Sequence, residues 1–408
     1  MPFRATLSHF LRPEIAAPKN LVRAEPSNRP TLRVMDYPNQ PTTDPNKKVP
    51  TKADLFTPLT IRGVTIRNRI AVSPMCEYSS HDGFAHDWHL VHLGSRAVGG
   101  AGLVITEATA VEPRGRITPA DLGIWMDEHV DKLAQIAAFI KEQGAVPGIQ
   151  IAHAGRKASC RVPWESGTPI PVEDGGWQTV APSVVPFRDR DPLPAELDAA
   201  QIRVIVEAFS AATRRALAAG FELIEIHAAH GYLLHEFYSP LSNRRADKYG
   251  GSFDNRVRLT LEIAESVRGI SPGHLPLFVR ISSVDWKEGG WTLDDSVKLA
   301  EDLHSRGVDL IDCSSGGLVH DAKVMIGPAY QVPFAERIRR EVNILTGAVG
   351  LITDPHQADK IVRSGHADMV LLARQMLRDP YWPLHAAHAL QVDLEPPVQY
   401  QRAFPDQE

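Results

Sequence analysis

The sequence predicts one α/β domain folded as a (β/α)8 barrel, also called a TIM barrel, with an N-terminal extension. From Leu55 onward, eight short runs of β-branched and other apolar residues alternate with longer amphipathic stretches. Each run is almost continuously apolar, which is typical of strands buried on both faces of a parallel sheet. Eight strand–helix repeats favour a closed barrel over a doubly wound sheet, which is the competing architecture.

The eight predicted strands are short and are flanked by polar, Gly or Pro residues. They are 70–73, 103–106, 148–152, 223–226, 277–281, 310–313, 344–346 and 369–372. Helices are predicted where apolar residues recur every three or four positions, at 128–143, 199–219, 256–268, 294–306, 333–340 and 355–364. Several helices end in a glycine that suits a left-handed stop, namely Gly144, Gly220, Gly307 and Gly365.

Residues 1–50 differ in composition from the rest, and we predict that they form a flexible extension to a barrel domain at 51–408. They carry several prolines and scattered arginines without a sustained apolar period, a composition that does not support a packed core. A transit peptide is the alternative, but Glu14, Glu25 and Asp36 are present and serine is sparse, which weakens that interpretation. We therefore expect a cytoplasmic protein, with organelle targeting by the extension as the open alternative.

The composition of the 408-residue chain excludes several classes of protein. The net charge of −5 gives no sign of binding to nucleic acid or to an anionic membrane, and no apolar run is long enough to cross a bilayer. The three cysteines, Cys76, Cys160 and Cys313, are widely spaced and odd in number. This pattern argues against a disulfide framework and against a four-thiolate iron–sulfur cluster.

The chemistry of such a barrel takes place at the carboxyl ends of its strands. The residues that the sequence places there, in strand order, are Ser73, Pro74, Met75, Cys76, Tyr78, Ala108, Gln150, His227, His230, Tyr232, Arg280, Gly350, Ala373 and Arg374. A long loop at 157–197, rich in Pro and Gly, follows the third strand and is a candidate lid.

The last two strand ends favour a phosphate-bearing ligand. Barrels often hold a phosphate between these loops, and here Gly350 lets the backbone approach while the guanidinium of Arg374 can bind two oxygens. No G-x-G-x-x-G sequence follows a predicted strand and opens a helix. A Rossmann-type nicotinamide site is therefore not expected.

His227 and His230 allow three interpretations. They could be metal ligands, a structural pair, or two donors to a substrate carbonyl oxygen. In the third case each donor aimed at a developing enolate typically contributes about 3 kcal/mol to transition-state stabilisation. Tyr232 follows two residues later and could deliver a proton to carbon or simply pack as a buried ring.

The remaining polar strand-end residues are also open to more than one interpretation. Arg280 could neutralise an anionic ring system or pair with a distant carboxylate. Gln150 offers a donor and an acceptor in one plane, which suits the edge of a heterocycle. Cys76 could be a nucleophile, but the sequence identifies no general base with an orienting partner for it.

Together these motifs closely resemble the Old Yellow Enzyme family, in particular its thermophilic-like class of ene-reductases. The similarity covers nearly all of 55–404 and leaves out the first fifty residues. It includes SPMC at 73–76, HAGRK at 153–157, IHAAHGYL at 226–233 and FYSPLSNR at 237–244, as well as segments 55–59, 68–70, 115–117, 249–252 and 397–400.

The resemblance implies a tightly but non-covalently bound FMN at the barrel mouth. By position, Ser73, Pro74, Met75, Cys76 and Ala108 would contact the isoalloxazine, Gln150 its pyrimidine edge, and Arg280 the region of N1 and O2. Gly350, Ala373 and Arg374 would hold the phosphate, although the family usually has glycine where this chain has Ala373. Cys76 would tune the flavin potential, and Tyr78 would contact substrate.

The implied reaction is a ping-pong reduction of activated C=C bonds in enones, enals and maleimides. NADPH or NADH would give hydride to flavin N5 and leave, and the acceptor would then take its place. His227 and His230 would bind its carbonyl and Tyr232 would protonate its α-carbon. The class also suggests a homodimer or homotetramer in which Arg402 of the C-terminal tail enters a neighbouring subunit's site.

Two other functions remain open from the residues. A metal-dependent barrel lyase or hydrolase would use His227 and His230 as ligands, although the first strand end offers only Ser-Pro-Met-Cys beside them. A flavoprotein that only stores or senses is the other. Nucleic-acid and membrane partners are not expected from the charge and hydropathy of the chain.

Overall fold

The computed structural model describes residues 53–403 of the chain. The predictions for 1–50, a flexible extension or a transit peptide, therefore lie outside the described residues. Within residues 53–403, the helices are too short or too polar to span a membrane.

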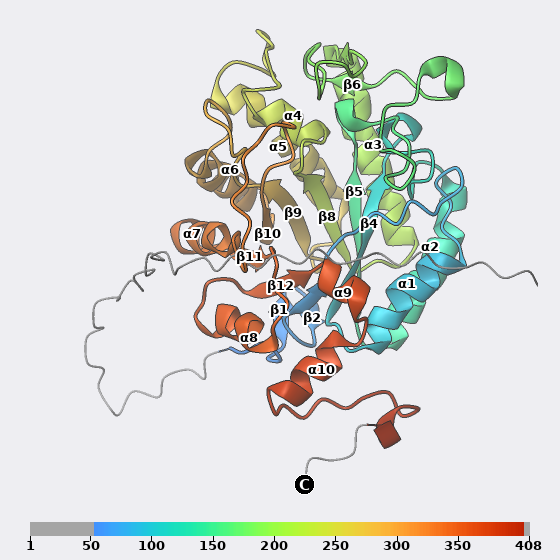
Figure 1. Cartoon of the computed structure of the whole chain (residues 1–408), viewed down its shortest axis with the longest axis vertical. Helices are drawn as coiled ribbons and strands as arrows, with labels where there is room; N and C mark the ends of the chain where they lie inside the picture. The colour runs from blue at the N-terminus through green and yellow to red at the C-terminus, as the bar shows by residue number, and fades with distance from the viewer. Residues whose placement is uncertain (1–52, 404–408) are drawn as a thin grey trace, which may run out of the picture. The chain divides into compact units, whose positions relative to one another are not determined.

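Eight parallel strands form a closed barrel, which confirms the predicted fold (Figure 1). In their order around the barrel they are β3 (Ile70–Val72), β4 (Leu103–Ala110), β5 (Val146–Ala152), β8 (Leu223–Ala228), β9 (Leu277–Ser282), β10 (Leu310–Ser314), β11 (Leu345–Ala348) and β12 (Met369–Leu372). β12 pairs with β3 and so closes the ring. Each of the eight overlaps a predicted strand.

Helices connect the strands, and six of them confirm the predicted ones. These six are α2 (Val130–Glu142), α3 (Ala199–Ala218), α5 (Phe253–Ile270), α6 (Leu293–Ser305), α7 (Val332–Val342) and α8 (Pro355–Arg363). The glycines predicted to stop helices, Gly144, Gly220, Gly307 and Gly365, all have left-handed φ between 72° and 85°. Four further helices had no predicted range: α1 (Asp87–Val98), α4 (Leu233–Tyr238), α9 (Arg374–Arg378) and α10 (Trp382–Ala389).

A β-hairpin that was not predicted from the sequence closes the amino-terminal end of the barrel. It consists of β1 (Leu59–Ile61) and β2 (Val64–Ile66), which pair antiparallel. Ile66 of this hairpin lies in one apolar cluster with Leu103 and Phe278 from the barrel interior. The bottom of the barrel is therefore filled and sealed, and only the opposite end can hold a ligand.

On three neighbouring strands, the polarity of the inward-facing side chains changes along the barrel axis. Alternate residues of a strand point to the same face, so each strand presents a series of inward side chains. From bottom to mouth these series are Leu223, Glu225 and His227 on β8, Phe278, Arg280 and Ser282 on β9, and Leu310, Asp312 and Ser314 on β10. The interior is thus apolar at the bottom, charged in the middle and polar at the mouth.

The long loop predicted as a lid connects β5 to α3. It contains two short strands that pair in parallel, β6 (Val180–Ala181) and β7 (Ala195–Glu196). Figure 1 shows β6 and α4 together at the top of the view, and α4 directly follows the carboxyl end of β8. The loop therefore lies on the mouth side of the barrel.

Candidate active site

The structure brings nearly all of the predicted site residues together around the barrel mouth. Because neighbouring strands end at the same edge, residues that are far apart in sequence become neighbours there. The backbone N–H of Ser73, after β3, donates to the carbonyl of Leu372 at the end of β12 at 3.1 Å. Gln150 of β5 and Glu225 of β8 are paired in register, as are His227 of β8 and Arg280 of β9.

Three aromatic side chains gather above β8. The His227 ring lies 5.2 Å from the ring of His230 and 5.2 Å from that of Tyr232, in each case roughly edge to face. His230 has left-handed backbone (φ 59°), which turns the chain so that both imidazoles face the mouth. Its Nε2 lies 2.7 Å from the Ser314 hydroxyl, and its backbone N–H donates to Ser282 Oγ at 2.8 Å.

These three groups are neutral hydrogen-bond donors. Burial, and after it the positive charge of Arg280, lower the pKa of both His227 and His230 well below the usual histidine value. Burial raises the pKa of Tyr232 well above that of a free phenol. Nδ1 of His227 is buried without a hydrogen-bond partner among the described residues. A buried donor of this kind normally has a partner, so the site is suited to a ligand oxygen.

A charged layer lies directly beneath the mouth, and only half of it was predicted from the sequence. Gln150 Nε2 donates to Glu225 Oε1 at 2.7 Å, and Arg280 Nε lies 3.0 Å from Asp312 Oδ2. Pairing with a distant carboxylate, one of the two interpretations of Arg280, is therefore confirmed. Glu225 and Asp312 were not predicted as site residues. Each of the two is an acidic residue inside an otherwise apolar strand, and this is the sequence signal that could have identified them.

The predicted phosphate-binding residues lie at the ends of β11 and β12. Gly350 has φ +117°, a conformation that side chains other than glycine rarely adopt. Arg374 is exposed and makes no ion pair with any residue of 53–403. Ala373, which replaces the family's usual glycine, has φ −99°. A negative φ does not require glycine, so the alanine fits at this position.

Cys76 and Tyr78 lie on the segment that follows β3. Burial, and then the nearby carboxyl groups of Asp121 and Glu107, raise the pKa of the Cys76 thiol well above its usual value. A thiol that keeps its proton is a poor nucleophile, which argues against Cys–His catalysis here. Ala108 and Tyr232 line a small hollow together with Asp121, next to this segment.

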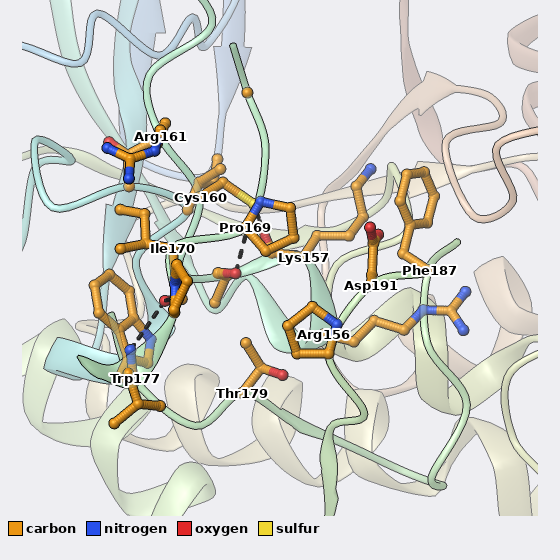
Figure 2. A pocket seen from close by; sticks show the side chains of 18 of the residues that line it. Arg156, Lys157, Cys160, Arg161, Pro169, Ile170, Trp177, Thr179, Phe187 and Asp191 are labelled. Atoms are coloured by element: carbon orange, nitrogen blue, oxygen red, sulfur yellow. Dashed lines mark hydrogen bonds between the residues drawn. The ribbon is translucent and has the colours of Figure 1, made fainter. Parts of the chain in front are cut away.

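A cavity of about 630 Å³ opens beside the mouth, beneath the long loop (Figure 2). Tyr78, Lys157 and Ile117 line it, and Ile117 also lines the hollow beside Tyr232. Trp177 and Phe187 add aromatic surface, and the basic side chains Arg161, Arg188 and Arg190 also line it. A cavity of this size can hold a ligand much larger than a simple enone.

Lys157 links the cavity to the three aromatic residues, and it was not predicted as a site residue. Its Nζ donates to the backbone carbonyls of His230 at 2.7 Å and Gly317 at 3.0 Å. It also lies 4.9 Å from the centre of the Tyr232 ring. Burial lowers the pKa of Lys157 to about 8. Its place at the end of HAGRK, directly after β5, was the signal that could have identified it.

The structure of a single chain does not bring Arg402 to the mouth, and it places no metal site among the described residues. Arg402 lies on the exposed C-terminal segment Gln401–Ala403. The dark red C-terminal end of the described chain is at the bottom of Figure 1, on the side of α10, whereas β6 and α4 are at the top. Its predicted entry into a neighbouring subunit's site stays a prediction. As for metals, residues 53–403 contain no group of three or more His, Cys, Asp or Glu side chains placed to hold an ion.

Comparison with known proteins places this geometry in a family. Residues 54–393 match the model of the NADH:flavin oxidoreductase / NADH oxidase family. The chain belongs to this family, the Old Yellow Enzyme family. Family members act as flavin oxidoreductases with NAD(P)H, and this enzyme is accordingly FMN-dependent.

Two bacterial enzymes and one solved structure illustrate the similarity. The NADPH dehydrogenase of Geobacillus sp. (strain WCH70) is 53% identical over 352 residues, which are 86% of this chain and 98% of that enzyme. The NADPH dehydrogenase of Bacillus subtilis (strain 168) is 47% identical over 352 residues, 86% of this chain and 99% of that enzyme. Morphinone reductase in complex with tetrahydroNAD has a TM-score of 0.69 at 26% identity, covering 84% of this chain and 92% of that one.

The mouth of this barrel suits FMN on its own features. The hydroxyl of Ser73, like Nδ1 of His227, is buried without a partner among residues 53–403. Gln150 and Arg280 supply polar groups for a planar heterocycle, and Gly350 and Arg374 lie at the strand ends where barrels hold phosphate. An amide and a buried cation suit the ring system of a flavin mononucleotide, and the arginine beside a glycine suits its phosphate.

Proposed function

We propose that this enzyme reduces C=C bonds conjugated to an electron-withdrawing carbonyl, as in enones, enals and maleimides, at the expense of NADPH or NADH. The observation that carries the proposal is the group of three neutral donors, His227, His230 and Tyr232, around one point of the mouth. A site that hydrolyses or eliminates with a metal would instead need further ligands beside the histidines.

His227 and His230 polarise the acceptor. Each neutral imidazole donates one hydrogen bond to the carbonyl oxygen, where negative charge develops as the β-carbon receives hydride. For His230, the contact between Nε2 and the Ser314 hydroxyl leaves Nδ1 to face the substrate, and Nδ1 can donate when that hydroxyl donates to Nε2. The imidazoles are uncharged and already buried. They therefore stabilise the developing enolate by hydrogen bonds, and no charged group has to lose its water shell first.

Tyr232 completes the reduction with a proton. Its raised pKa keeps the phenol protonated until a strongly basic α-carbon forms beside it. Transfer of that proton, together with the hydride at the β-carbon, saturates the double bond. Lys157, 4.9 Å from the ring centre, then lies close to the phenolate that the transfer leaves behind and can stabilise it electrostatically.

The cofactor residues follow from the same geometry. FMN, when bound, accepts hydride from the nicotinamide and supplies it to the acceptor. Ser73, Pro74, Met75, Cys76 and Ala108 would contact its ring system, Gln150 and Arg280 its pyrimidine side, and Gly350, Ala373 and Arg374 its phosphate. Cys76 acts on the flavin potential as a neutral thiol, because its pKa is raised.

The nicotinamide, as hydride donor, and the alkene acceptor would bind at the mouth one after the other. Morphinone reductase, which is similar in structure, has been solved with tetrahydroNAD bound, and we infer that the nicotinamide reaches the mouth here in the same way. Tyr78 lines the loop cavity and would contact the acceptor. A homodimer or homotetramer that shares Arg402, and a cytoplasmic location, belong to the same proposal.

His227→Ala tests the polarising donor. We expect about a 10²- to 10³-fold slower oxidative half-reaction with cyclohexenone, because one hydrogen bond to the developing enolate is lost, and weaker binding of phenols. Stopped-flow kinetics and titration of the phenol charge-transfer band measure both effects. His274→Ala, at an exposed histidine near the β1–β2 hairpin, is the matched control and should leave both unchanged.

The same experiments separate the competing functions. A yellow protein that oxidises NADPH steadily when cyclohexenone is present supports an ene-reductase and rejects a flavoprotein that only stores or senses. Unchanged phenol bands in His227→Ala would contradict the role of the histidine. A colourless protein whose activity is abolished by a chelator would instead indicate a metal-dependent lyase or hydrolase.

A further inference from the structure

The mechanism above uses Gln150 and Arg280 of the charged layer inside the barrel but gives no role to its two acids, Glu225 and Asp312. The layer consists of Gln150, Glu225, Arg280 and Asp312, whose exposed fractions are 1%, 0%, 5% and 0%. Branched apolar residues usually fill this depth of a barrel. Burying charged groups costs free energy that their pairing does not reliably return, so the layer calls for a functional explanation.

The contacts within the layer leave it short of hydrogen-bond donors. Gln150 Nε2 donates to one oxygen of Glu225. Arg280 Nε and Asp312 Oδ2 are within ion-pair distance at 3.0 Å, but not aligned as a hydrogen bond. Oε2 of Glu225 and both carboxyl oxygens of Asp312 are buried without a donor among residues 53–403. A proton on one of the two acids would supply a missing donor.

A charge count leads to the same conclusion. Two carboxyl groups face one guanidinium and one neutral amide, so full ionisation would leave an uncompensated negative charge where no water reaches. Asp312 lies against Arg280, which favours its ionised form, whereas the hydrogen-bond partner of Glu225 is the neutral amide of Gln150. Burial, and then the charge of Asp312, raise the pKa of Glu225. Glu225 is therefore the acid that keeps the proton.

We propose that Glu225 is a positioning residue of the cofactor site, which fixes the Gln150 amide and holds a proton that keeps the layer below the cofactor neutral. It acts through Gln150 and Arg280, since it lies one inward position below the mouth on β8. This inference rests on the proposed place of FMN, but not on the identity of the acceptor.

The proposal has a consequence for the flavin potential. The charged or titratable groups that face Glu225 are Arg280 on β9, Asp312 on β10 and, two residues along its own strand, His227, while β5 contributes the neutral Gln150. When Glu225 loses its proton at alkaline pH, a negative charge appears beneath the cofactor and opposes the addition of electrons. The midpoint potential should then fall more steeply with pH.

The experiment is a redox titration of the FMN-loaded enzyme from acidic to alkaline pH. Wild type should show the steeper alkaline fall. Glu225→Gln keeps the size and the acceptor oxygen of the side chain but cannot ionise. It should therefore match wild type at neutral pH, lack the steepening, and lie above wild type at alkaline pH. Glu236→Gln is the matched control, since Glu236 is equally buried but pairs with the backbone of Arg156 outside the layer, and it should behave as wild type.

A second variant keeps the proposal testable if Glu225→Gln does not fold. Asp312→Asn removes the counter-ion of Arg280, so Glu225 takes over that place and loses its proton more readily. The steepening should then move to lower pH. A steepening that persists in Glu225→Gln, that disappears equally in Glu236→Gln, or that stays at the same pH in Asp312→Asn would overturn the proposal. None of these outcomes depends on whether enones are reduced.

Discussion

The two halves of the barrel interior differ in kind, although the same strands build both. The lower half of β8, β9 and β10 presents Leu223, Phe278 and Leu310, and the next inward positions present Glu225, Arg280 and Asp312. All six are buried. A shift of two residues, about 7 Å along a strand, therefore separates an apolar core from a layer of charges.

The difference shows which half stabilises the fold and which half serves the ligand. Each fully buried apolar side chain in the lower half contributes about 1.5–3 kcal/mol. The buried charged groups of the upper half are of a kind that often contributes no more to stability than apolar residues of similar volume would. We conclude that the upper half is retained for ligand binding and for the electrostatic field that its charges create at the mouth. The lower half and the β1–β2 hairpin supply the stability that offsets the cost of burying those charges.

The largest effect is expected at the mouth, from Tyr232→Phe. Loss of the phenolic proton should slow the oxidative half-reaction about 10²- to 10⁴-fold, while the reductive half-reaction and the unfolding free energy stay close to wild type. Stopped-flow measurement of each half-reaction checks this. Tyr249→Phe removes a hydroxyl that bonds Glu262 away from the mouth, and should change neither rate. A slow reductive half-reaction in Tyr232→Phe would mean that the residue shapes the site instead of donating a proton.

The opposite pattern is expected from Phe278→Ala in the lower half. Phe278 is fully buried in the apolar cluster, so its truncation should lower the unfolding free energy by about 3–5 kcal/mol. Both half-reactions of the folded enzyme should stay near wild type. Urea unfolding at fixed FMN concentration measures the first quantity, and Phe278→Leu should cost much less. Rates reduced as strongly as stability would show that the two halves are not separable.

The sequence alone predicted the lower half and the strand order well. Buried parallel strands are continuous apolar runs, so all eight were found, and β12 was found with its exact bounds. Helix stops were predictable for a local reason, because Gly144 and Gly365 adopt left-handed φ. The β1–β2 hairpin was missed because each of its three-residue strands has an exposed residue between two buried ones, and so lacks the continuous apolar run that identified the equally short β3.

The upper half was predicted only where a residue stands at a strand end. His227, His230, Tyr232 and Arg280 follow from that rule, and the structure brings them together. Asp312 as the partner of Arg280 could not be predicted, since it depends on the register between β9 and β10. Arg402 is a different case, because its predicted place lies in a second subunit.

The smallest effect should come from the charged layer, as a pH dependence of stability. The raised pKa of Glu225 means that the folded state holds a proton that the unfolded chain releases above about pH 4.3. Stability therefore falls as pH rises from that value toward the folded pKa, and levels off above it. Glu225→Gln lacks this loss, so its unfolding free energy relative to wild type should increase from about pH 5 to about pH 9.

Phe278→Ala provides the contrast that makes this measurement decisive. Phe278 is paired in register with Glu225 but has no titratable group of its own, so the stability difference between Phe278→Ala and wild type should change with pH much less than that of Glu225→Gln. Urea unfolding of the three proteins with equal FMN compares the two differences directly, and FMN must be matched because it binds only the folded state. If the Glu225→Gln difference were as flat as that of Phe278→Ala, Glu225 would carry no extra proton in the folded enzyme. The charged layer would then have to be balanced by a group other than this acid.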